Sequence, residues 1–443
     1  MSDSLGAWLR KLEAGVPGGA MKLGLERMKD AIDVLGLRPQ APIVTVGGTN
    51  GKGSVCACVE SIAKEAGVKV GCFTSPHLLR YNERIRINGE ELSDEKIVES
   101  FERVERANRP DRRISYFEYN ALAAMDAFMR ARCELIVLEV GMGGRLDAAN
   151  AFDADVAVVS TVDIDHAQFL GDTIEKIAFE KAGIFRPNKW AIYGDVSIPR
   201  SLENRAQEIG APLLAYGRDF SAASDGRMQW NYAFNGYDPN DRPDKPEAPR
   251  PRVSSLPKRT RYAMPLPPMR GDAQIKNAAT ALTVFECLRA RIDPDQSSVK
   301  RGVSLAVAKG RFQVLPGRPL TVLDVGHNPQ AARNLKSNMG MLPFARRSVA
   351  VFSILADKDI DACLNEMKGQ FDLWRVAPLA GPRGRDKANL LAAFAKAGIK
   401  EVVCHDSIAE AWMAAKSEAK EDDRIVVFGS FHTVAEAMRA GAH

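Results

Sequence analysis

The chain has 443 residues, of which 45% are hydrophobic and 26% are charged, and 61 Lys and Arg against 56 Asp and Glu give a net charge of +5. This length predicts two domains, and the composition is that of a globular protein rather than a disordered one. The small charge excess gives no reason to expect a nucleic-acid partner. We also expect no membrane contact and a cytoplasmic location, because no apolar run is long enough to span a bilayer and the first residues lack a signal-peptide pattern.

Apolar runs typical of buried strands alternate with helical patterns through the first part of the chain. The predicted strands are Ile43–Val46, Leu135–Val140 and Val156–Val162, and the predicted helices between them include Ser54–Ala66 and Tyr119–Ala131. Strands that read as continuous apolar runs are buried on both faces. The alternation therefore predicts a parallel sheet with helices on both sides.

The region from Ser221 to Pro268 interrupts this alternation. Its segment Pro239–Pro257 holds six prolines among charged residues and predicts an exposed loop or insertion. The basic residues in and after this segment are consistent with an anion contact, although a solvated loop is the favoured interpretation. They are Arg250, Arg252, Lys258, Arg259 and Arg261.

The alternation resumes with a helix predicted over 272–291, and Asp293-Pro294-Asp295 is a natural break where we place the domain boundary. The second half again predicts alternating strands and helices. Its predicted strands are Leu320–Val325, Ser348–Ile354, Leu373–Pro378, Glu401–His405 and Arg424–Phe428, and its helices include Ser407–Ser417 and Thr433–Ala440.

A glycine-rich segment, Gly47–Ser54, follows the first predicted strand and precedes a predicted helix. Glycines let the backbone approach a polyphosphate, and the loop amides and the helix N-terminus direct positive partial charge at it. Lys52 adds a full charge, and the Ser54 hydroxyl can reach a phosphate or its metal. Gly53 separates the lysine from the serine, so the sequence of this segment is not that of the standard P-loop. The setting still favours nucleotide binding over a tight turn with an exposed lysine.

Polar side chains also stand at the carboxyl ends of two other predicted strands. Glu139 lies at the end of one, and Asp163-Ile164-Asp165-His166 follows the next. A carboxylate in an apolar strand is unfavourable unless it is paired or metal-bound, and this edge is where open α/β sheets bind ligands. With the glycine-rich segment, these residues predict one shared site. The metal stays open at this point: Glu139 with ATP phosphates suits Mg²⁺, whereas His166 alone suggests zinc.

Four residues of the later chain are weaker candidates. Arg311, within Gly310–Gln313, is equally consistent with phosphate binding and with an exposed arginine. Asp324 ends a predicted strand, again at a ligand-facing position. Gln274 and Asn277 share a helix face, for which a solvated polar face is the simpler interpretation.

Taken together, these motifs resemble the folylpolyglutamate synthase and dihydrofolate synthase family, relatives of the Mur ligases. The bifunctional bacterial branch is the most similar. Ala273 and Gly326 depart from the family pattern, which often has histidine and alanine there. The motifs that carry the resemblance are Gly48–Ser54, Thr74–Leu78, Arg80–Gly89, Tyr116–Glu118, Glu139–Asp147, Asp165–His166 with Leu170–Gly171, Glu180–Ile184, Gly310–Gln313, Asp324–Pro329, Ala356–Asp359 and Gly429–Thr433.

The resemblance implies an α/β fold with two domains. Residues 1–293 would form a P-loop, Mur-ligase-type ATPase domain with a parallel sheet, which also binds the pterin. Residues 294–443 would form a smaller Rossmann-like glutamate ligase domain. The implied cofactors are ATP, two Mg²⁺ ions and a monovalent cation. The implied partners are dihydropteroate, tetrahydrofolate and L-glutamate, and we expect a monomer.

The resemblance also assigns roles by position. The nucleotide-binding residues would be Thr49, Asn50, Gly51, Lys52, Gly53, Ser54, Asn277, Arg311, Asp324 and His327. The metal-binding residues would be Ser75, Glu139, His166 and Lys181, the last as a carbamate whose oxygen lies near the second Mg²⁺. Lys52, His166 and Lys181 would be the catalytic residues. The pterin pocket would be lined by Phe117, Glu118, Tyr119, Leu146, Asp147 and Ala148.

The implied reaction is ATP-dependent ligation of L-glutamate to dihydropteroate, giving dihydrofolate, and to tetrahydrofolate, giving folylpolyglutamates. It proceeds through an acyl phosphate and releases ADP and phosphate. One alternative is a Mur-type cell-wall amino-acid ligase. Those enzymes carry a sizeable domain before the phosphate-binding loop, whereas fewer than about fifty residues precede Gly47 here, which argues against this alternative. The other is an ATPase module without ligase activity, which would release phosphate independently of pterin and glutamate.

Overall fold

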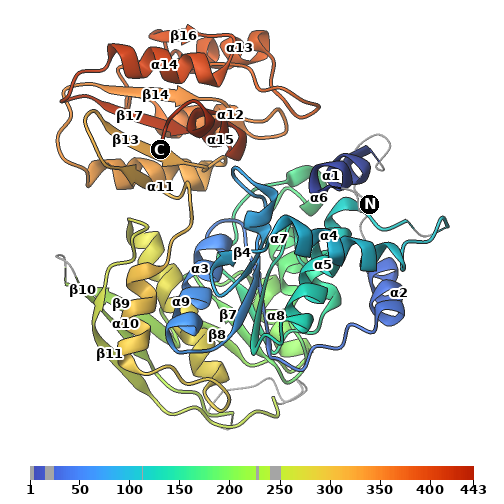
Figure 1. Cartoon of the computed structure of the whole chain (residues 1–443). Helices are drawn as coiled ribbons and strands as arrows, with labels where there is room; N and C mark the ends of the chain where they lie inside the picture. Colours follow the sequence, from blue (N-terminus) through green and yellow to red (C-terminus); the bar gives the residue numbers. More distant parts are fainter. Residues whose placement is uncertain (1–3, 15–23, 112, 226–228, 240–250) are drawn as a thin grey trace.

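The computed structural model describes residues 4–14, 24–111, 113–225, 229–239 and 251–443. A larger N-terminal lobe and a smaller C-terminal lobe, each an α/β layered structure, meet at a narrow junction (Figure 1). The predicted fold class, with a parallel sheet in the first domain and a separate α/β domain after it, is confirmed.

The N-terminal lobe is built on an eight-stranded sheet in the order β4-β3-β2-β5-β1-β6-β7-β8. Neighbouring strands from β2 to β8 run parallel, and β3 and β4 add an antiparallel edge. The strands are β1 (Ile43–Gly47), β2 (Val70–Phe73), β3 (Ile85–Ile87), β4 (Glu90–Glu91), β5 (Leu135–Glu139), β6 (Val156–Val159), β7 (Trp190–Tyr193) and β8 (Leu213–Ala215). Because β1 lies between β5 and β6, the carboxyl ends of these three strands meet at one edge.

Alternate residues of the central strands enter two different cores. Ile136 and Leu138 of β5 pack on one side, whereas Leu135 and Val137 pack on the other. Successive strand side chains point to opposite faces, so a strand covered on both sides must be apolar at every position. This is the continuous apolar pattern from which β5 was predicted.

Helices cover both faces of this sheet (Figure 1). Helices α3, α9 and α10 contribute to one core, and α1, α2, α4, α5, α7 and α8 contribute to the other. The bounds are α1 (Leu5–Ala14), α2 (Glu26–Leu35), α3 (Lys52–Glu65), α4 (Asp94–Glu105), α5 (Tyr116–Arg130), α6 (Ala167–Leu170), α7 (Ile174–Ala182), α8 (Arg200–Glu208), α9 (Asp272–Leu288) and α10 (Gln296–Leu305), with short 3₁₀ helices at Tyr81–Arg84 and Ala148–Ala151.

A second, three-stranded antiparallel sheet occupies the region in which the sequence suggested only an interruption. It consists of β9 (Phe220–Ser224), β10 (Gln229–Phe234) and β11 (Arg259–Pro265), in the order β11-β10-β9. Alternate residues of β10, namely Trp230, Tyr232 and Phe234, are buried in the core that α9 shares. The strand period of two was present in the sequence, and the neighbouring prolines masked it.

The predicted loop Pro239–Pro257 connects β10 to β11. Residues 240–250, Arg250 among them, lie outside the described residues. The expectation of a solvated loop is wrong for Arg259 and Arg261, which lie on β11 and pair with the fully buried Glu286 of α9. A buried carboxylate requires such partners.

The packing of helix α10 favours a domain boundary later than the predicted one. The helix lies beyond Asp293, yet Val299 and Val303 are buried in the core formed with α3 and α9. A boundary between residues 293 and 294 would separate this helix from its packing partners. We therefore propose that the first domain ends after α10.

The C-terminal lobe is built on a six-stranded sheet in the order β12-β13-β17-β14-β15-β16, parallel except for β12. Its strands are β12 (Gln313–Leu315), β13 (Leu320–Asp324), β14 (Ser348–Phe352), β15 (Leu373–Val376), β16 (Val402–Cys404) and β17 (Arg424–Phe428). Its helices are α11 (Pro329–Gly340), α12 (Ile360–Met367), α13 (Lys387–Ala397), α14 (Ile408–Glu418) and α15 (Phe431–Arg439).

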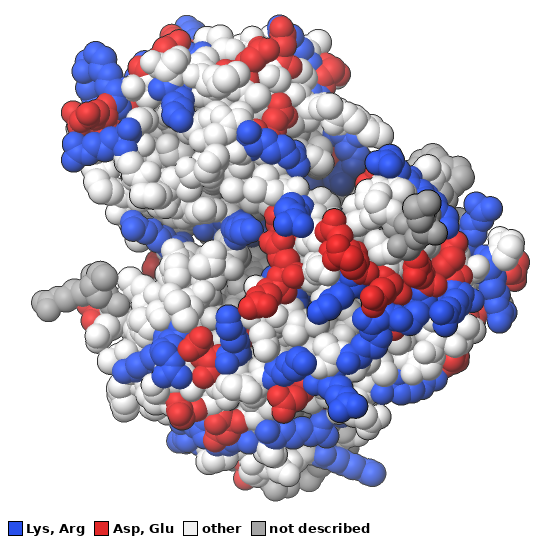
Figure 2. Space-filling view, in the orientation of Figure 1, with Lys and Arg blue, Asp and Glu red and all other residues white. Residues whose placement is uncertain are grey.

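The two lobes are joined by apolar packing as well as by the chain. Leu78, from the N-terminal lobe, is buried in a core of the C-terminal lobe that also holds Val325 and Val434. Acidic and basic side chains are intermingled on the face drawn in Figure 2, and the surface is hollowed between the lobes. None of the helices in the described ranges is long and apolar enough to cross a membrane.

Candidate active site

The glycine-rich loop connects β1 to α3 and requires glycine at two positions. Gly48 has φ 144° and Gly51 has φ 87°, conformations that favour glycine. A Cβ atom on Gly48 would lie 2.0 Å from Ser160 Oγ, and one on Gly51 would lie 2.6 Å from Asn277 Oδ1. The loop ends at the N-terminus of α3, whose first amides have no acceptor within the helix and can bind phosphate oxygens.

Lys52 is not the exposed lysine of the alternative interpretation. Its Nζ donates to the carbonyl oxygens of Gly48, at 3.0 Å, and Thr49, at 3.3 Å. Burial lowers the pKa of Lys52, and the charge of Glu139 opposes that effect. The ammonium group is therefore held over the loop, where a bound polyphosphate would compete for it with two neutral carbonyls.

The strand ends enclose a cavity of about 100 Å³. The loop Gly48–Lys52 lines one side of it, and Glu139 and His166 line another, so the structure brings together the three motifs that were predicted to share a site. The remaining lining residues are Ser75, Pro76, Gly141, Met142, Gly143, Asp165, Leu170, Lys181, Arg311, His327 and Phe431.

Glu139 is the buried carboxylate of this cavity, at 2% exposure. Its Oε2 accepts a hydrogen bond from the Ser75 amide at 3.0 Å, and among the described residues no donor bonds to Oε1. Burial raises the pKa of Glu139, and the charge of Lys52 opposes this. A buried carboxylate with free acceptor capacity is suited to a hard cation.

The donor set favours Mg²⁺ over zinc. Within the described residues, no group of three or more His, Cys, Asp and Glu is placed to hold a metal. Zinc sites supply three or four protein ligands, whereas Mg²⁺ is usually bound by one or two carboxylates with waters and substrate phosphates. Glu139 beside the phosphate-binding loop fits the second pattern.

Burial lowers the pKa of two basic side chains of the cavity. His166 has a positive φ of 51° at the start of α6, a strained conformation of the kind found at functional sites. Burial lowers the pKa of His166 to about 4, despite the opposing charge of Asp165. Burial likewise lowers the pKa of Lys181 to about 7, and the charge of Lys52 adds to that effect.

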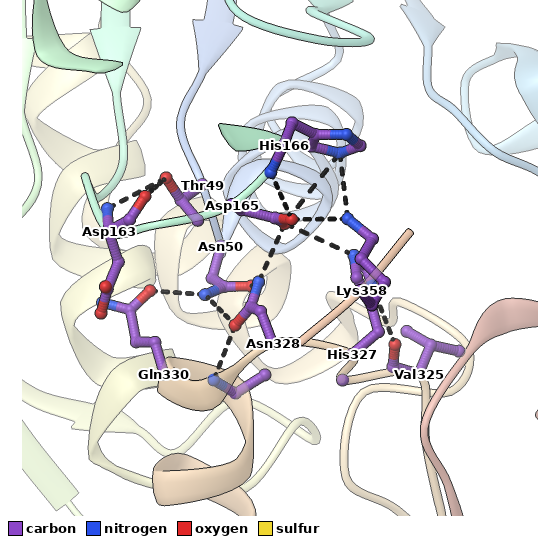
Figure 3. Close-up of polar contacts among 12 residues, drawn as sticks. Thr49, Asn50, Asp163, Asp165, His166, Val325, His327, Asn328, Gln330 and Lys358 are labelled. Carbon is purple, nitrogen blue, oxygen red and sulfur yellow. Dashed lines mark hydrogen bonds and ion pairs between the residues drawn. The ribbon is translucent and has the colours of Figure 1, made fainter. Parts of the chain in front are cut away.

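Side chains of both lobes form a polar network beside this cavity (Figure 3). Lys358 donates to Asp165 at 2.5 Å and lies 3.2 Å from His166 Nε2. Asn328 donates to Asp165 at 3.1 Å and exchanges hydrogen bonds with Asn50 of the glycine-rich loop. The C-terminal lobe therefore contacts the phosphate-binding loop and the His166 segment directly.

A second cavity, of about 460 Å³, adjoins the first and shares Ser75, His166 and Phe431 with it. Of the predicted pterin-pocket residues, Phe117, Glu118, Leu146, Asp147 and Ala148 line it. The ring of Phe117 packs so closely on Gly141 that a Cβ atom there would lie 2.6 Å from it. Burial raises the pKa of Asp147 to about 6. The combination of an apolar wall and a buried acid is suited to a flat heteroaromatic ring with hydrogen-bond donors.

The comparisons with known proteins agree with this geometry. Two family models match the chain, the Mur ligase middle domain over residues 46–285 and the Mur ligase glutamate ligase domain over residues 310–431. The dihydrofolate synthase/folylpolyglutamate synthase of Escherichia coli (strain K12) is 41% identical to this chain, over 99% of the chain and 95% of the relative. The chain belongs to this family of Mur ligases.

Solved structures of the family superpose over the whole chain. E. coli FolC in complex with DHPP and ADP has a TM-score of 0.86 at 39% identity, covering 99% of this chain and 97% of that one. A bifunctional folylpolyglutamate synthase/dihydrofolate synthase with Mn, AMPPNP and L-glutamate bound has a TM-score of 0.85 at 36% identity, covering 99% and 98%.

Five predicted site residues of this Mur ligase do not line either of the two adjoining cavities. Tyr119 is fully buried between Trp8 and Phe101, so the expectation that it lines the pterin pocket is wrong. Its position on α5 turns it to the core, one residue past Glu118. The other four, Gly53, Ser54, Asn277 and Asp324, stay predictions as nucleotide ligands. Asp324 accepts from the Phe312 and Gly326 amides, and Ser54 Oγ is buried with no partner in the described part of the chain.

Sequence reasoning missed three residues of the site. Lys358 lies within the family motif Ala356–Asp359, but the motif alone did not indicate that Lys358 contacts Asp165 and His166. Phe431, whose ring lies 5.2 Å from the Arg311 guanidinium carbon, was within a quoted motif but received no role. Arg84 lines the larger cavity and was hidden among the charged residues of Arg80–Gly89.

Proposed function

We propose that this enzyme joins L-glutamate to dihydropteroate, giving dihydrofolate, and to tetrahydrofolate, giving folylpolyglutamates, with ADP and phosphate as the other products. The observation that carries the proposal is the meeting of two cavities at Ser75 and His166. One is lined by the phosphate-binding loop and the other by Phe117 and Asp147. A carboxylate bound in the second cavity would face the terminal phosphate of ATP bound in the first.

The chemistry requires carboxylate activation, since a carboxylate repels an amine and oxide is a poor leaving group. A carboxylate oxygen attacks the γ-phosphorus of ATP, the bond to the β,γ-bridging oxygen breaks, and an acyl phosphate and ADP form. The glutamate amine then attacks the acyl carbon, phosphate leaves, and the amine loses a proton. Lys52 and the α3 N-terminus would neutralise the transferring phosphoryl group, and Arg311 would add charge from the second lobe.

The proposal includes two divalent cations, one held by Ser75 and Glu139 and the other near His166 and Lys181. The solved relative with Mn and AMPPNP supports a divalent cation beside the nucleotide. Such an ion orients the phosphates and stabilises their developing charge. Lys181 would serve as a carbamate, and its lowered pKa supports this, because only a neutral amine reacts with CO₂.

The junction between the lobes is suited to excluding water. An acyl phosphate hydrolyses if water reaches it, so the site must close during the reaction. The contacts of Asn328 and Lys358 with the first lobe describe such a closed arrangement. We propose that the enzyme works as a monomer, because side chains from both lobes of one chain line the two cavities.

Oxygen labelling tests the proposal. Dihydropteroate carrying ¹⁸O in its carboxylate, with ATP, Mg²⁺ and L-glutamate, should give dihydrofolate, ADP and phosphate containing one ¹⁸O per turnover by mass spectrometry. Formation of AMP and pyrophosphate, or phosphate without the label, would contradict the acyl-phosphate route. Phosphate release without glutamyl product would instead favour an ATPase module.

A further inference from the structure

Arg84 is a buried cation without an acidic partner. It ends the 3₁₀ helix Tyr81–Arg84, is 8% exposed, and lines the 460 Å³ cavity. Within the described ranges, no acidic side chain lies at ion-pairing distance from its guanidinium group. Burying an unpaired charge is costly, and buried charges are normally paired. An anionic ligand that bound here would pair with Arg84 and offset the free-energy cost of burying its charge.

The other Lys and Arg side chains that line this cavity differ from Arg84. Lys358 is paired with Asp165 at 2.5 Å, and Arg383 is paired with Asp357 at 2.7 Å. Their charges are already balanced inside the protein. Among the Lys and Arg side chains described around this cavity, Arg84 is the one that no acidic side chain pairs with.

The surroundings of Arg84 hold its guanidinium group in one orientation. Nε donates to His77 Nδ1 at 2.8 Å, and Cζ lies 5.7 Å from the ring centre of Tyr81 and 5.8 Å from that of Tyr116. His77 accepts this hydrogen bond, because the Nε–H group of Arg84 can only donate. With Nε engaged, the two terminal nitrogens form the fork that binds a carboxylate in bidentate fashion.

The position of Arg84 separates it from the reacting carboxylate. Residues that line the smaller, phosphate-side cavity include Lys52 and Lys181, but not Arg84. The carboxylate that is phosphorylated must lie at that cavity. Dihydropteroate has only this one carboxylate, whereas a folate carries a second one on its glutamate, which does not react.

We propose that Arg84 binds the non-reacting carboxylate of the glutamate already present on a folate substrate. This inference rests on the proposed function and deepens it, because it makes Arg84 a specificity-determining residue. Arg84 serves the second ligation and is dispensable for the first. The guanidinium group lies near the ring of Tyr116, which lines the same cavity as Phe117, so this charge stands in the cavity that has the apolar wall.

Ligand binding to the enzyme with Mg²⁺ and ADP tests the proposal without requiring turnover. The ligands are dihydropteroate, tetrahydrofolate, and tetrahydrofolate whose α-carboxylate is replaced by a carboxamide. The variants are Arg84→Gln and the charge-retaining Arg84→Lys. The control is Arg80→Gln in the same segment, whose side chain is 65% exposed. Thermal unfolding shows whether each variant is folded.

Wild-type enzyme and Arg80→Gln should bind the carboxamide about 10–100-fold more weakly than tetrahydrofolate, as expected for a charge-assisted hydrogen bond. The affinity of Arg84→Gln for tetrahydrofolate should fall by the same factor. This variant should bind tetrahydrofolate and the carboxamide equally well, and its affinity for dihydropteroate should not change. Arg84→Lys should lose less. Equal loss for dihydropteroate and tetrahydrofolate, or continued discrimination against the carboxamide, would overturn the assignment.

Turnover separates this proposal from the proposed function. An increase in the KM for L-glutamate in both reactions of Arg84→Gln would place Arg84 at the incoming glutamate and also refute the assignment. A wild-type enzyme that binds tetrahydrofolate through Arg84 but does not ligate glutamate would contradict the second activity and leave the assignment supported. A wild-type enzyme that ligates dihydropteroate but does not bind tetrahydrofolate would contradict the assignment.

Discussion

Lys358 of the C-terminal lobe donates a 2.5 Å hydrogen bond to Asp165 of the N-terminal lobe, and their side chains are only 3% and 9% exposed. Burial by itself raises the pKa of Asp165, but the charge of Lys358, followed by those of His166 and His327 when they are protonated, holds it well below its usual range. Asp165 is therefore ionised at neutral pH. The pair joins the two lobes beside His166.

Lys358→Met should loosen this junction. Removing one partner of a buried pair leaves the other charge uncompensated, at a cost of about 3–5 kcal/mol. We expect a larger radius of gyration by X-ray scattering with Mg²⁺ and ADP bound, and a lower kcat. Arg333 is the matched control, because it pairs with Asp163 and Glu366 at the same junction but is 48% exposed.

Arg333→Gln should keep near-wild-type turnover, since exposed ion pairs contribute about 0–1 kcal/mol. Combining Lys358→Met with Asp165→Asn should cost no more than the worse single change, because both remove the same contact. Additive losses in the double variant would show that the two residues act separately.

Lys52→Ala should abolish ligation while the protein stays folded. Within the described residues, the hydrogen bonds of Lys52 go only to two carbonyls of its own loop, so its loss removes charge from the phosphate site without removing an apolar core side chain. We expect kcat to fall by about 100-fold or more, as for other charge-stabilising donors. The assay is ADP formation with dihydropteroate and L-glutamate. Lys64→Ala, on the exposed face of the same helix, is the control. Equal rates of ADP formation by the two variants would contradict a role for Lys52 in phosphate binding.

Lys181 should carry a carbamate. Its pKa of about 7 leaves the amine largely neutral at pH 8 and protonated below pH 6, so carbamate formation and activity should rise across this interval and respond to added bicarbonate. With ¹³C-bicarbonate, NMR should show a carbamate carbon that Lys181→Arg lacks. The activity of that variant should fall by at least about 10–100-fold, the loss that follows removal of an outer-shell partner of a metal ligand. An arginine variant with full activity would refute the role.

Both ligations should use one catalytic centre. The described residues hold one phosphate-binding loop joined to one Glu139 and His166 set. His166→Ala should therefore abolish turnover of dihydropteroate and tetrahydrofolate together, and the two substrates should inhibit each other competitively. Loss of one activity alone would require a second centre.

The strands that carry the site were predictable because they are buried on both faces. Leu135–Glu139 reads as an uninterrupted apolar run that ends in an acid, and strand ends in a parallel sheet converge whatever the rest of the chain does. Trp230, Tyr232 and Phe234 alternate with less buried residues instead, and this short period was not recognised beside a proline-rich segment. The secondary structure of a strongly patterned segment is set by its own residues, so it can be predicted from that segment alone.

Contacts across the junction were not predictable in this way. Asp165 and Lys358 are 193 residues apart, and no periodicity relates them. Arg84 resembles its exposed neighbour Arg80 in sequence, and only the fold shows that one is buried and the other is not. The packing of Val299 against α3 and α9 was not predictable for the same reason, because most of its partners lie far away in the chain.

The central claim is that ATP cleavage here is coupled to joining glutamate to a pterin-bearing acid. The most direct measurement is the rate of ADP formation with dihydropteroate or tetrahydrofolate, each with and without L-glutamate. The account predicts sustained ADP formation only when a pterin substrate and L-glutamate are both present, with one glutamyl product for each ADP. ADP formation at the same rate without pterin and glutamate would contradict it.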